Sequence, residues 1–169
     1  MANLMKTFLA NTDVAEAGVW CDFDGTFFFE YEGVKHVTRF KLKHASETNG
    51  AYFSMIEKAM KKFINRRGKN KATFDQTFAI EVRAFCTHVL VGWEGFEESR
   101  PEQRQALIDA GKAPLLEYSY ENAVAIMTAA PELFKLLLEW AQEPGNFNTF
   151  GEDVKKPLPD ASPGTFPKS

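Results

Sequence analysis

Residues 18–42 have the sequence GVWCDFDGTFFFEYEGVKHVTRFKL, which carries the strongest β-strand and turn signals of the N-terminal part. Runs of β-branched and aromatic residues are interrupted by Asp24-Gly25 and by Glu32-Gly33. Asp-Gly between two such runs is a strong hairpin signal, because glycine accepts a positive φ. From Val34 to Leu42 the residues alternate, which indicates a strand with one wet face. We therefore predict a three-stranded antiparallel meander over residues 19–23, 26–31 and 34–42.

The chain after this stretch has helical periodicity. One helix face carries a stripe of apolar residues at helical spacing, namely Phe74, Phe78, Val82, Phe85 and Val89. Thr73 can cap the N-terminus of that helix. Gly68 can end the preceding helix, and Pro131 can occupy the first turn of the last helix. We expect helices over residues 47–67, 74–91, 101–110, 120–129 and 131–143, and a short one over residues 3–10. The predicted class is α+β, mostly α: the meander is followed by a small helical bundle.

Length and composition predict one domain and a tail. The chain has 169 residues, which fits a single domain. Five of its eight prolines lie between Pro144 and Ser169, and such a segment lacks the apolar residues of a packed core. We predict a single α+β domain over residues 1–147 and a flexible Pro/Gly-rich, disordered tail over residues 148–169.

Charge and cysteine content limit the possible environments. Residues 1–71 carry 12 Lys/Arg against 8 Asp/Glu, whereas residues 72–169 carry 8 against 15. This two-sided distribution suits complementary surfaces or ordered assembly. Two cysteines, Cys21 and Cys86, form no disulfide framework and favour a reducing compartment. The sequence has neither a membrane-spanning stretch nor a recognisable signal peptide, so we expect a cytoplasmic protein without membrane contact.

A short motif points to a possible catalytic site. Residues Asp22-Phe23-Asp24-Gly25-Thr26 match the first motif of haloacid-dehalogenase-type phosphatases, in which the first Asp is a nucleophile and both help to hold magnesium. A carboxylate can attack phosphorus while a cation neutralises the phosphate. That motif should end a buried parallel strand, but its flanks here predict an antiparallel hairpin. We prefer a structural turn, and keep a magnesium phosphatase using Asp22 and Asp24 as the alternative function.

Other ligand-binding patterns are weak. Cys86 and His88 are two residues apart in a predicted helix and so point apart, and we expect no metal site and no cofactor. Seven basic residues between Lys58 and Lys71 have no acid among them. They fit either a nucleic-acid patch or a solvated helix face whose cations suit a helix C-terminus. We favour the solvated face, because the domain as a whole is acidic, and consider nucleic acid an unlikely partner.

The second half of the chain resembles a known family. Trp93-Glu94-Gly95-Phe96 is followed by Glu117-Tyr118-Ser119-Tyr120-Glu121-Asn122-Ala123 and then by Pro131-Glu132-Leu133-Phe134. This order is similar to the "W-E-G" turn, the "Y-S-x-E-N-A" helix start and the closing "L-F" helix of the tail assembly chaperones of long-tailed bacteriophages. The resemblance covers roughly residues 17–147. Residues 99–114 resemble an insertion relative to the family.

The resemblance implies a function without catalysis. Such chaperones coat the long helical tape measure protein in the host cytoplasm and recruit the major tail tube protein, and self-association is possible. A helix-binding surface needs exposed apolar anchors. Trp93 and Phe96 flank a turn and fit either a contact surface or the core, and the helix over residues 131–143 looks too apolar for one buried face. We expect the partner-binding residues to be Trp93, Phe96, Phe134, Leu137, Leu138 and Trp140.

Overall fold

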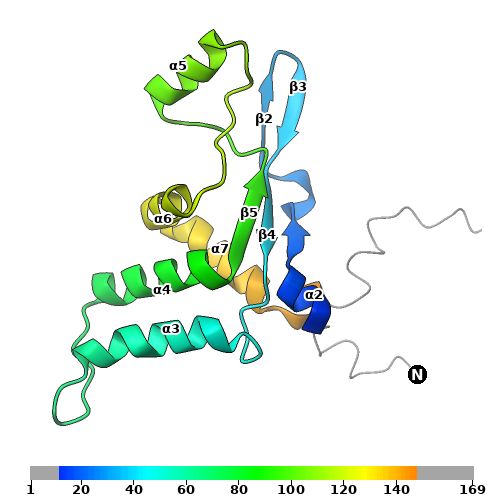
Figure 1. The fold of residues 1–169 in the computed structure, drawn as a ribbon. Coiled ribbons are helices and arrows are strands. Elements are labelled where there is room, and N and C mark those ends of the chain that lie inside the picture. The colour runs from blue at the N-terminus through cyan, green and yellow to red at the C-terminus, as the bar shows by residue number, and fades with distance from the viewer. Residues whose placement is uncertain (1–11, 148–169) are drawn as a thin grey trace, which may run out of the picture.

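The computed structural model describes residues 12–147 (Figure 1). Its elements follow in the order α2 (Thr12–Ala17), β1 (Val19–Cys21), η1 (Phe23–Gly25), β2 (Phe28–Tyr31), β3 (Val34–Val37), β4 (Arg39–Leu42), α3 (Gly50–Met60), η2 (Lys61–Phe63), α4 (Phe74–His88), β5 (Leu90–Glu94), α5 (Pro101–Asp109), α6 (Tyr120–Ala129), α7 (Pro131–Gln142) and η3 (Pro144–Phe147). The helix predicted over residues 3–10 and the tail predicted over residues 148–169 lie outside the described residues.

The predicted fold class is confirmed, since antiparallel N-terminal strands precede a mostly helical remainder. One predicted turn is also correct. Strands β2 and β3 form a hairpin in which Tyr31 pairs with Val34 across Glu32 and Gly33. The two turn residues have φ values of 50° and 78°, and positive φ at both positions matches the twist of the flanking strands.

The pairing of the first strand differs from the prediction. Strand β1 pairs with β4, with Val19 opposite Leu42, and not with β2. The Asp22 carboxylate accepts a hydrogen bond from the Asp24 amide at 3.1 Å, and Phe23 and Asp24 have left-handed φ values of 47° and 56°. This short turn leads the chain out of the sheet, so the hairpin predicted at Asp24-Gly25 is wrong.

Strand β5 replaces the end of a predicted helix. Helix α4 ends at His88, and Leu90–Glu94 pairs antiparallel with β4, with Trp93 opposite Phe40. The sheet therefore has the order β1-β4-β5. Pairing with β4 satisfies backbone groups that a longer helix would leave unpaired at the sheet edge. The helix predicted over residues 74–91 is therefore three residues too long, and Trp93 and Glu94 belong to a strand.

Most helix starts agree with their capping residues. The Thr73 hydroxyl accepts from the Gln76 amide at 3.2 Å, and the Gln76 side chain accepts from the Thr73 amide at 2.9 Å, which is a capping box. Ser119 caps α6, and prolines occupy the first turns of α5 and α7. The helix predicted over residues 47–67 is shorter, because α3 ends at Met60 and η2 at Phe63; Gly68 lies in the loop beyond.

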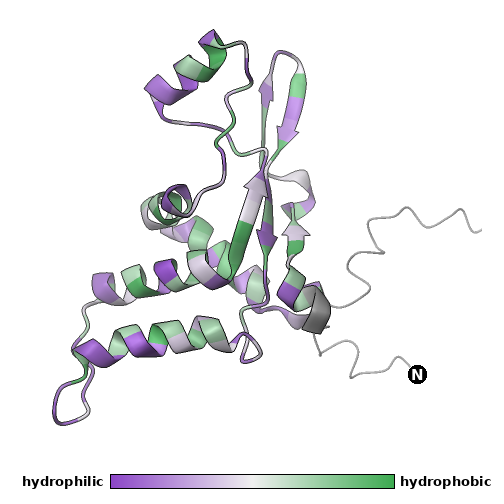
Figure 2. Ribbon diagram, viewed as in Figure 1, coloured by the Kyte–Doolittle hydropathy of each residue, from purple (hydrophilic) through white to green (hydrophobic). Residues whose placement is uncertain are grey.

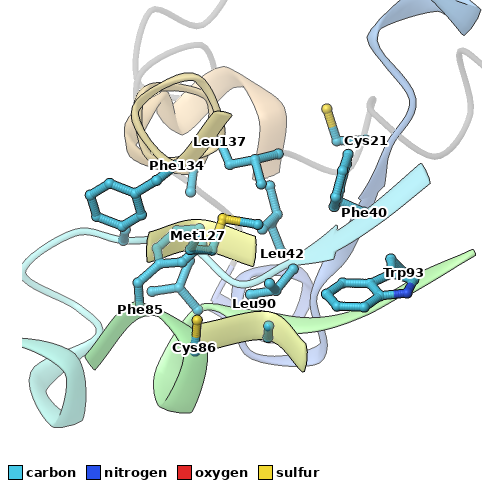
Figure 3. Packing of buried hydrophobic residues seen from close by; sticks show 14 of the residues in the cluster. Cys21, Phe40, Leu42, Phe85, Cys86, Leu90, Trp93, Met127, Phe134 and Leu137 are labelled. Atoms are coloured by element: carbon cyan, nitrogen blue, oxygen red, sulfur yellow. The ribbon is translucent and has the colours of Figure 1, made fainter. Parts of the chain in front are cut away.

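The core lies between the sheet and helices α4, α6 and α7. Figure 3 shows strand side chains Phe40, Leu42 and Leu90 directed toward Met127 and Leu137 of the helices. All five are at most 2% exposed. Helix α3 packs along α4 and adds Tyr52 to the core. Hydrophilic residues gather on the loop that joins α3 and α4 (Figure 2).

Candidate partner-binding surface

Three of the six residues predicted to bind a partner lie in the core. Trp93, Phe134 and Leu137 are 6%, 4% and 0% exposed. The Trp93 indole donates a hydrogen bond to the Leu116 carbonyl at 2.8 Å, and Phe134 packs edge-on against Phe85 with ring centroids 5.2 Å apart. The structure thus places Trp93 in the core, which was one of the two roles that its sequence allowed. In this conformation these three side chains stabilise the fold and present little surface.

The other three predicted residues are half-buried and are not all together. Trp140 packs against Phe147 with centroids 5.5 Å apart, and Leu138 packs against the core. Phe96 lies between Trp93 and Phe40, at 5.2 Å and 5.9 Å between ring centroids. Most of the apolar surface of α7 is therefore accounted for by its own core contacts, with Leu136 left 36% exposed.

Phe96 lines an open groove, here called the aromatic groove. This hollow lies between the base of the β2–β3 hairpin and the N-terminal end of α7. It has a volume of about 370 Å³ and is lined by Thr26, Phe27, Phe28, Phe29, Thr38, Phe40, Phe96, Glu97 and Leu133. Five of these nine residues are phenylalanines, so the groove offers mostly apolar contact area to an occupant.

The exposed rings of the aromatic groove come from residues that the sequence analysis assigned only to a strand. Phe27 is 38% exposed and Phe28 is 51% exposed. Phe29, which is half-buried, stacks on His36 of β3 at 4.9 Å between centroids. A signal was available, because successive side chains of a strand point to opposite faces. Successive phenylalanines therefore reach both faces of the hairpin, and their burial depends on which other elements cover each face.

A glycine at the end of β5 brings Phe96 to this position. Gly95 has a φ of 64°, and a Cβ at this residue would lie 2.1 Å from the Val37 carbonyl oxygen. Only glycine allows the two backbones to approach this closely. The Thr38 hydroxyl donates to the Gly95 carbonyl at 2.9 Å, which holds the end of β5 against the hairpin. The glycine of the "W-E-G" motif is therefore explained by the close approach of two backbone segments at Gly95.

Ion pairs stiffen the segment beside the groove. Glu97 accepts a hydrogen bond from Arg104 at 2.9 Å, and Arg39 pairs with Glu94. Glu98 is 3% exposed and accepts from the Arg100 guanidinium at 2.8 Å and 2.6 Å. These hydrogen bonds hold the pKa of Glu98 below its usual range. The groove thus combines an apolar lining with a charged and ordered rim.

The Asp22–Thr26 motif has a different setting from that of a phosphatase. It forms η1 at the edge of an antiparallel sheet, whereas the alternative function requires the end of a parallel strand. The Asp22 carboxylate is engaged by the Asp24 amide, and the Thr26 hydroxyl donates to the Phe23 carbonyl. These contacts support the interpretation of the motif as a structural turn.

The remaining candidate residues are spread over the molecule. Cys21 and Cys86 are buried, and burial raises the pKa of the Cys86 thiol to about 12. Residues 12–147 contain no group of three or more His, Cys, Asp or Glu side chains that could hold a metal ion. The basic stretch from Lys58 to Lys71 lies at the far end of α3 and in the loop before α4. Within the same residues, no helix is long and apolar enough to cross a bilayer.

Comparison with known proteins gives one family. A family model described as "YdaY prophage protein" matches residues 46–153, which is more than half of the chain. No curated protein and no solved structure matches. The matched range includes α3 to η3 and most of the segments that carry the motifs described above.

Proposed function

We propose, from the premise that this chain belongs to the YdaY prophage protein family, that it is a tail assembly chaperone. In this proposal the protein binds apolar helical stripes of the tape measure protein in the host cytoplasm. It keeps them from aggregating and recruits tail tube subunits before it leaves. Membership of a prophage family supports a phage-related role, and the order of motifs from Trp93 to Phe134 supports the chaperone assignment.

The aromatic groove is the observation that carries the proposal. Phe27 and Phe28 expose large parts of their rings next to the half-buried Phe96 and Leu133. Full burial of a phenylalanine is worth roughly 1.5–3 kcal/mol, so covering the exposed parts of Phe27 and Phe28 contributes about 1 kcal/mol each. Together the two rings contribute far less than the roughly 8 kcal/mol of a micromolar complex, so a bound helix must make further contacts along the groove.

The shape of the groove fits a side-chain row of an amphipathic helix. Such a helix inserts apolar anchors at positions i, i+3 or i+4, and i+7 into a hydrophobic groove. A volume of about 370 Å³ is near the lower end of ligand pockets, which suits a few anchors and not a whole helix. A larger and more open hollow of about 490 Å³ along α3 is lined by small and basic residues, and offers less apolar contact.

The test uses the exposed phenylalanines. The Phe27→Ser/Phe28→Ser variant should keep the fold, since both side chains are exposed, but should lose most of the binding. We expect a tape measure segment from the encoding prophage to stay soluble when co-expressed with the wild-type chain, and to become insoluble with this variant. Solubility is measured by fractionation, and affinity by titration calorimetry with a synthetic amphipathic segment of that tape measure protein.

A matched control is provided by Phe74, which is 83% exposed at the start of α4 and outside the groove. Phe74→Ser removes as much exposed aromatic surface and should leave tape measure solubility unchanged. Equal solubility of the segment with and without the wild-type chain would contradict the proposed function. Equal effects of the groove and control variants would contradict the assignment of the groove.

A further inference from the structure

A strongly basic surface lies far from the aromatic groove, and we call it the basic tip. It consists of the exposed side chains Lys58, Lys61, Lys62, Arg66, Arg67, Lys69 and Lys71. Figure 1 shows it as the free end of the α3–α4 pair, projecting from the body. Lys61 pairs with Glu57 at 3.2 Å, and the other six cations form no ion pair with the described residues.

The part of the basic tip that follows η2 is an ordered loop. Ile64 and Asn70 pair across it, and the Asn65 side chain accepts hydrogen bonds from the amides of Arg67 and Lys69 at 2.9 Å and 3.0 Å. Ile64 is 48% exposed beside these cations. A preorganised loop loses little entropy on binding. The cations of this loop and its exposed apolar residue match an acidic surface that has an apolar centre.

Such a surface lies on the outer face of α7. Glu132, Leu136 and Glu139 occupy positions i, i+4 and i+7, which share one face of a helix, and all three are exposed. Glu143 continues this face at the C-cap. Neither Glu132 nor Glu139 forms an ion pair within residues 12–147. The face therefore has an exposed leucine among three carboxylates, with one exposed cation, Lys135, at its side, and it is acidic on balance.

We propose that the basic tip of one copy of this chain docks on the outer face of α7 of a second copy. The two surfaces match in charge and in their apolar centres, Ile64 on one and Leu136 on the other. They cannot meet within one molecule, because the tip is at the free end of the α3–α4 pair, away from α7 (Figure 1). A nucleic acid fits less well, since residues 72–169 have an excess of seven acids that would repel it.

The contact is heterologous, since it joins two different surfaces. Each copy keeps one free tip and one free α7 face, so the association continues into a ring or an open chain. Pairs of exposed charges are screened by salt, and the association is therefore salt-sensitive. The inference does not depend on the aromatic groove and goes beyond the proposed function.

The test is a charge exchange between the two surfaces. The first variant carries Arg66→Glu and Arg67→Glu, and the second carries Glu132→Lys and Glu139→Lys; all four positions are exposed. Sedimentation velocity of the full chain in about 50 mM NaCl should show mass rising with concentration for the wild type, and association at least about tenfold weaker in about 500 mM NaCl. Each variant alone should remain monomeric, and an equimolar mixture of the two should associate again.

Circular dichroism shows whether the variants fold. The Arg83→Glu/Lys112→Glu variant, with the same change of charge at exposed positions outside both surfaces, should associate like the wild type. A wild-type chain that stays monomeric in low salt would overturn the proposal, as would a variant mixture that fails to associate. Retarded migration of single-stranded or duplex DNA that requires Arg66 and Arg67, with a monomeric wild type, would assign the tip to nucleic acid instead.

Discussion

At the residue scale, Gly95 has the most demanding position of the glycines within residues 12–147. Its positive φ and the 2.1 Å approach of a Cβ to the Val37 carbonyl are two separate costs. Gly33 has a similar φ of 78° but no atom within 4 Å of its Cβ position. Comparison of these two glycines therefore separates backbone strain from steric overlap.

We expect Gly95→Ala to lower the free energy of unfolding by more than about 2 kcal/mol, because the strain is added to a clash with backbone. Gly33→Ala should cost only about 1 kcal/mol from the strain of left-handed backbone. Urea denaturation followed by tryptophan fluorescence measures both. Equal losses for the two variants would mean that the close approach at Gly95 is relieved without cost.

The residues of the candidate site were predictable in part. The "W-E-G" motif directed attention to Phe96, which does line the groove. The motif also directed attention to Trp93, whose ring is buried in the core and donates a hydrogen bond to the Leu116 carbonyl. Sequence patterns identify large apolar residues but do not distinguish a covered ring from an exposed one. Phe27 and Phe28 were missed because exposure on a hairpin depends on what packs against it.

At the element scale, helix starts could be predicted from nearby residues, whereas strand pairing over long distances in the sequence could not. Helix starts at Thr73, Ser119 and Pro131 follow from side chains that satisfy nearby backbone groups, and the structure agrees. Strand β5 depends on β4, which lies about 50 residues earlier. The apolar residues at the start of β5 also fit the helical spacing of the preceding stripe. Periodicity alone therefore predicted a helix that runs too far. The same limitation produced the wrong partner for β1.

The junction between β4 and the end of α7 depends on a buried histidine. His44 is 5% exposed and packs on Phe147 at 4.7 Å between ring centroids. Its Nε2 lies 3.4 Å from the Gln142 carbonyl oxygen, and its Nδ1 lies 3.0 Å from the Ser46 hydroxyl. Burial lowers the pKa of His44 below 6.5, although the Gln142 carbonyl and the Glu143 carboxylate oppose this shift.

Stability should therefore fall as the pH drops below about 6.5. Above that pH the imidazole is neutral in both states and its contribution is complete. Below it the unfolded chain binds a proton that the folded chain resists, and each tenfold difference in proton affinity is worth about 1.4 kcal/mol. Urea denaturation at pH 7.5 and 5.5 should show this loss in the wild type and a smaller one in His44→Gln. Identical pH dependence in both chains would exclude His44 as its source.

At the scale of the whole molecule, three surfaces of different character lie apart. The aromatic groove lies by the β2–β3 hairpin, the basic tip at the free end of α3 and α4, and the acidic face on α7. The sequence predicted the two-sided charge but not where the surfaces lie, because that depends on how the helices pack. The prediction of one domain over residues 1–147 stays a prediction. Membership of a prophage family places the molecule in phage biology.

Binding of a tape measure helix in the aromatic groove can be followed by hydrogen–deuterium exchange of the full chain, with and without a soluble tape measure segment. We expect added protection of backbone amides at residues 26–29, 96–97 and 133, and no change in the basic tip. No protection anywhere, or protection confined to residues outside the groove, would contradict it.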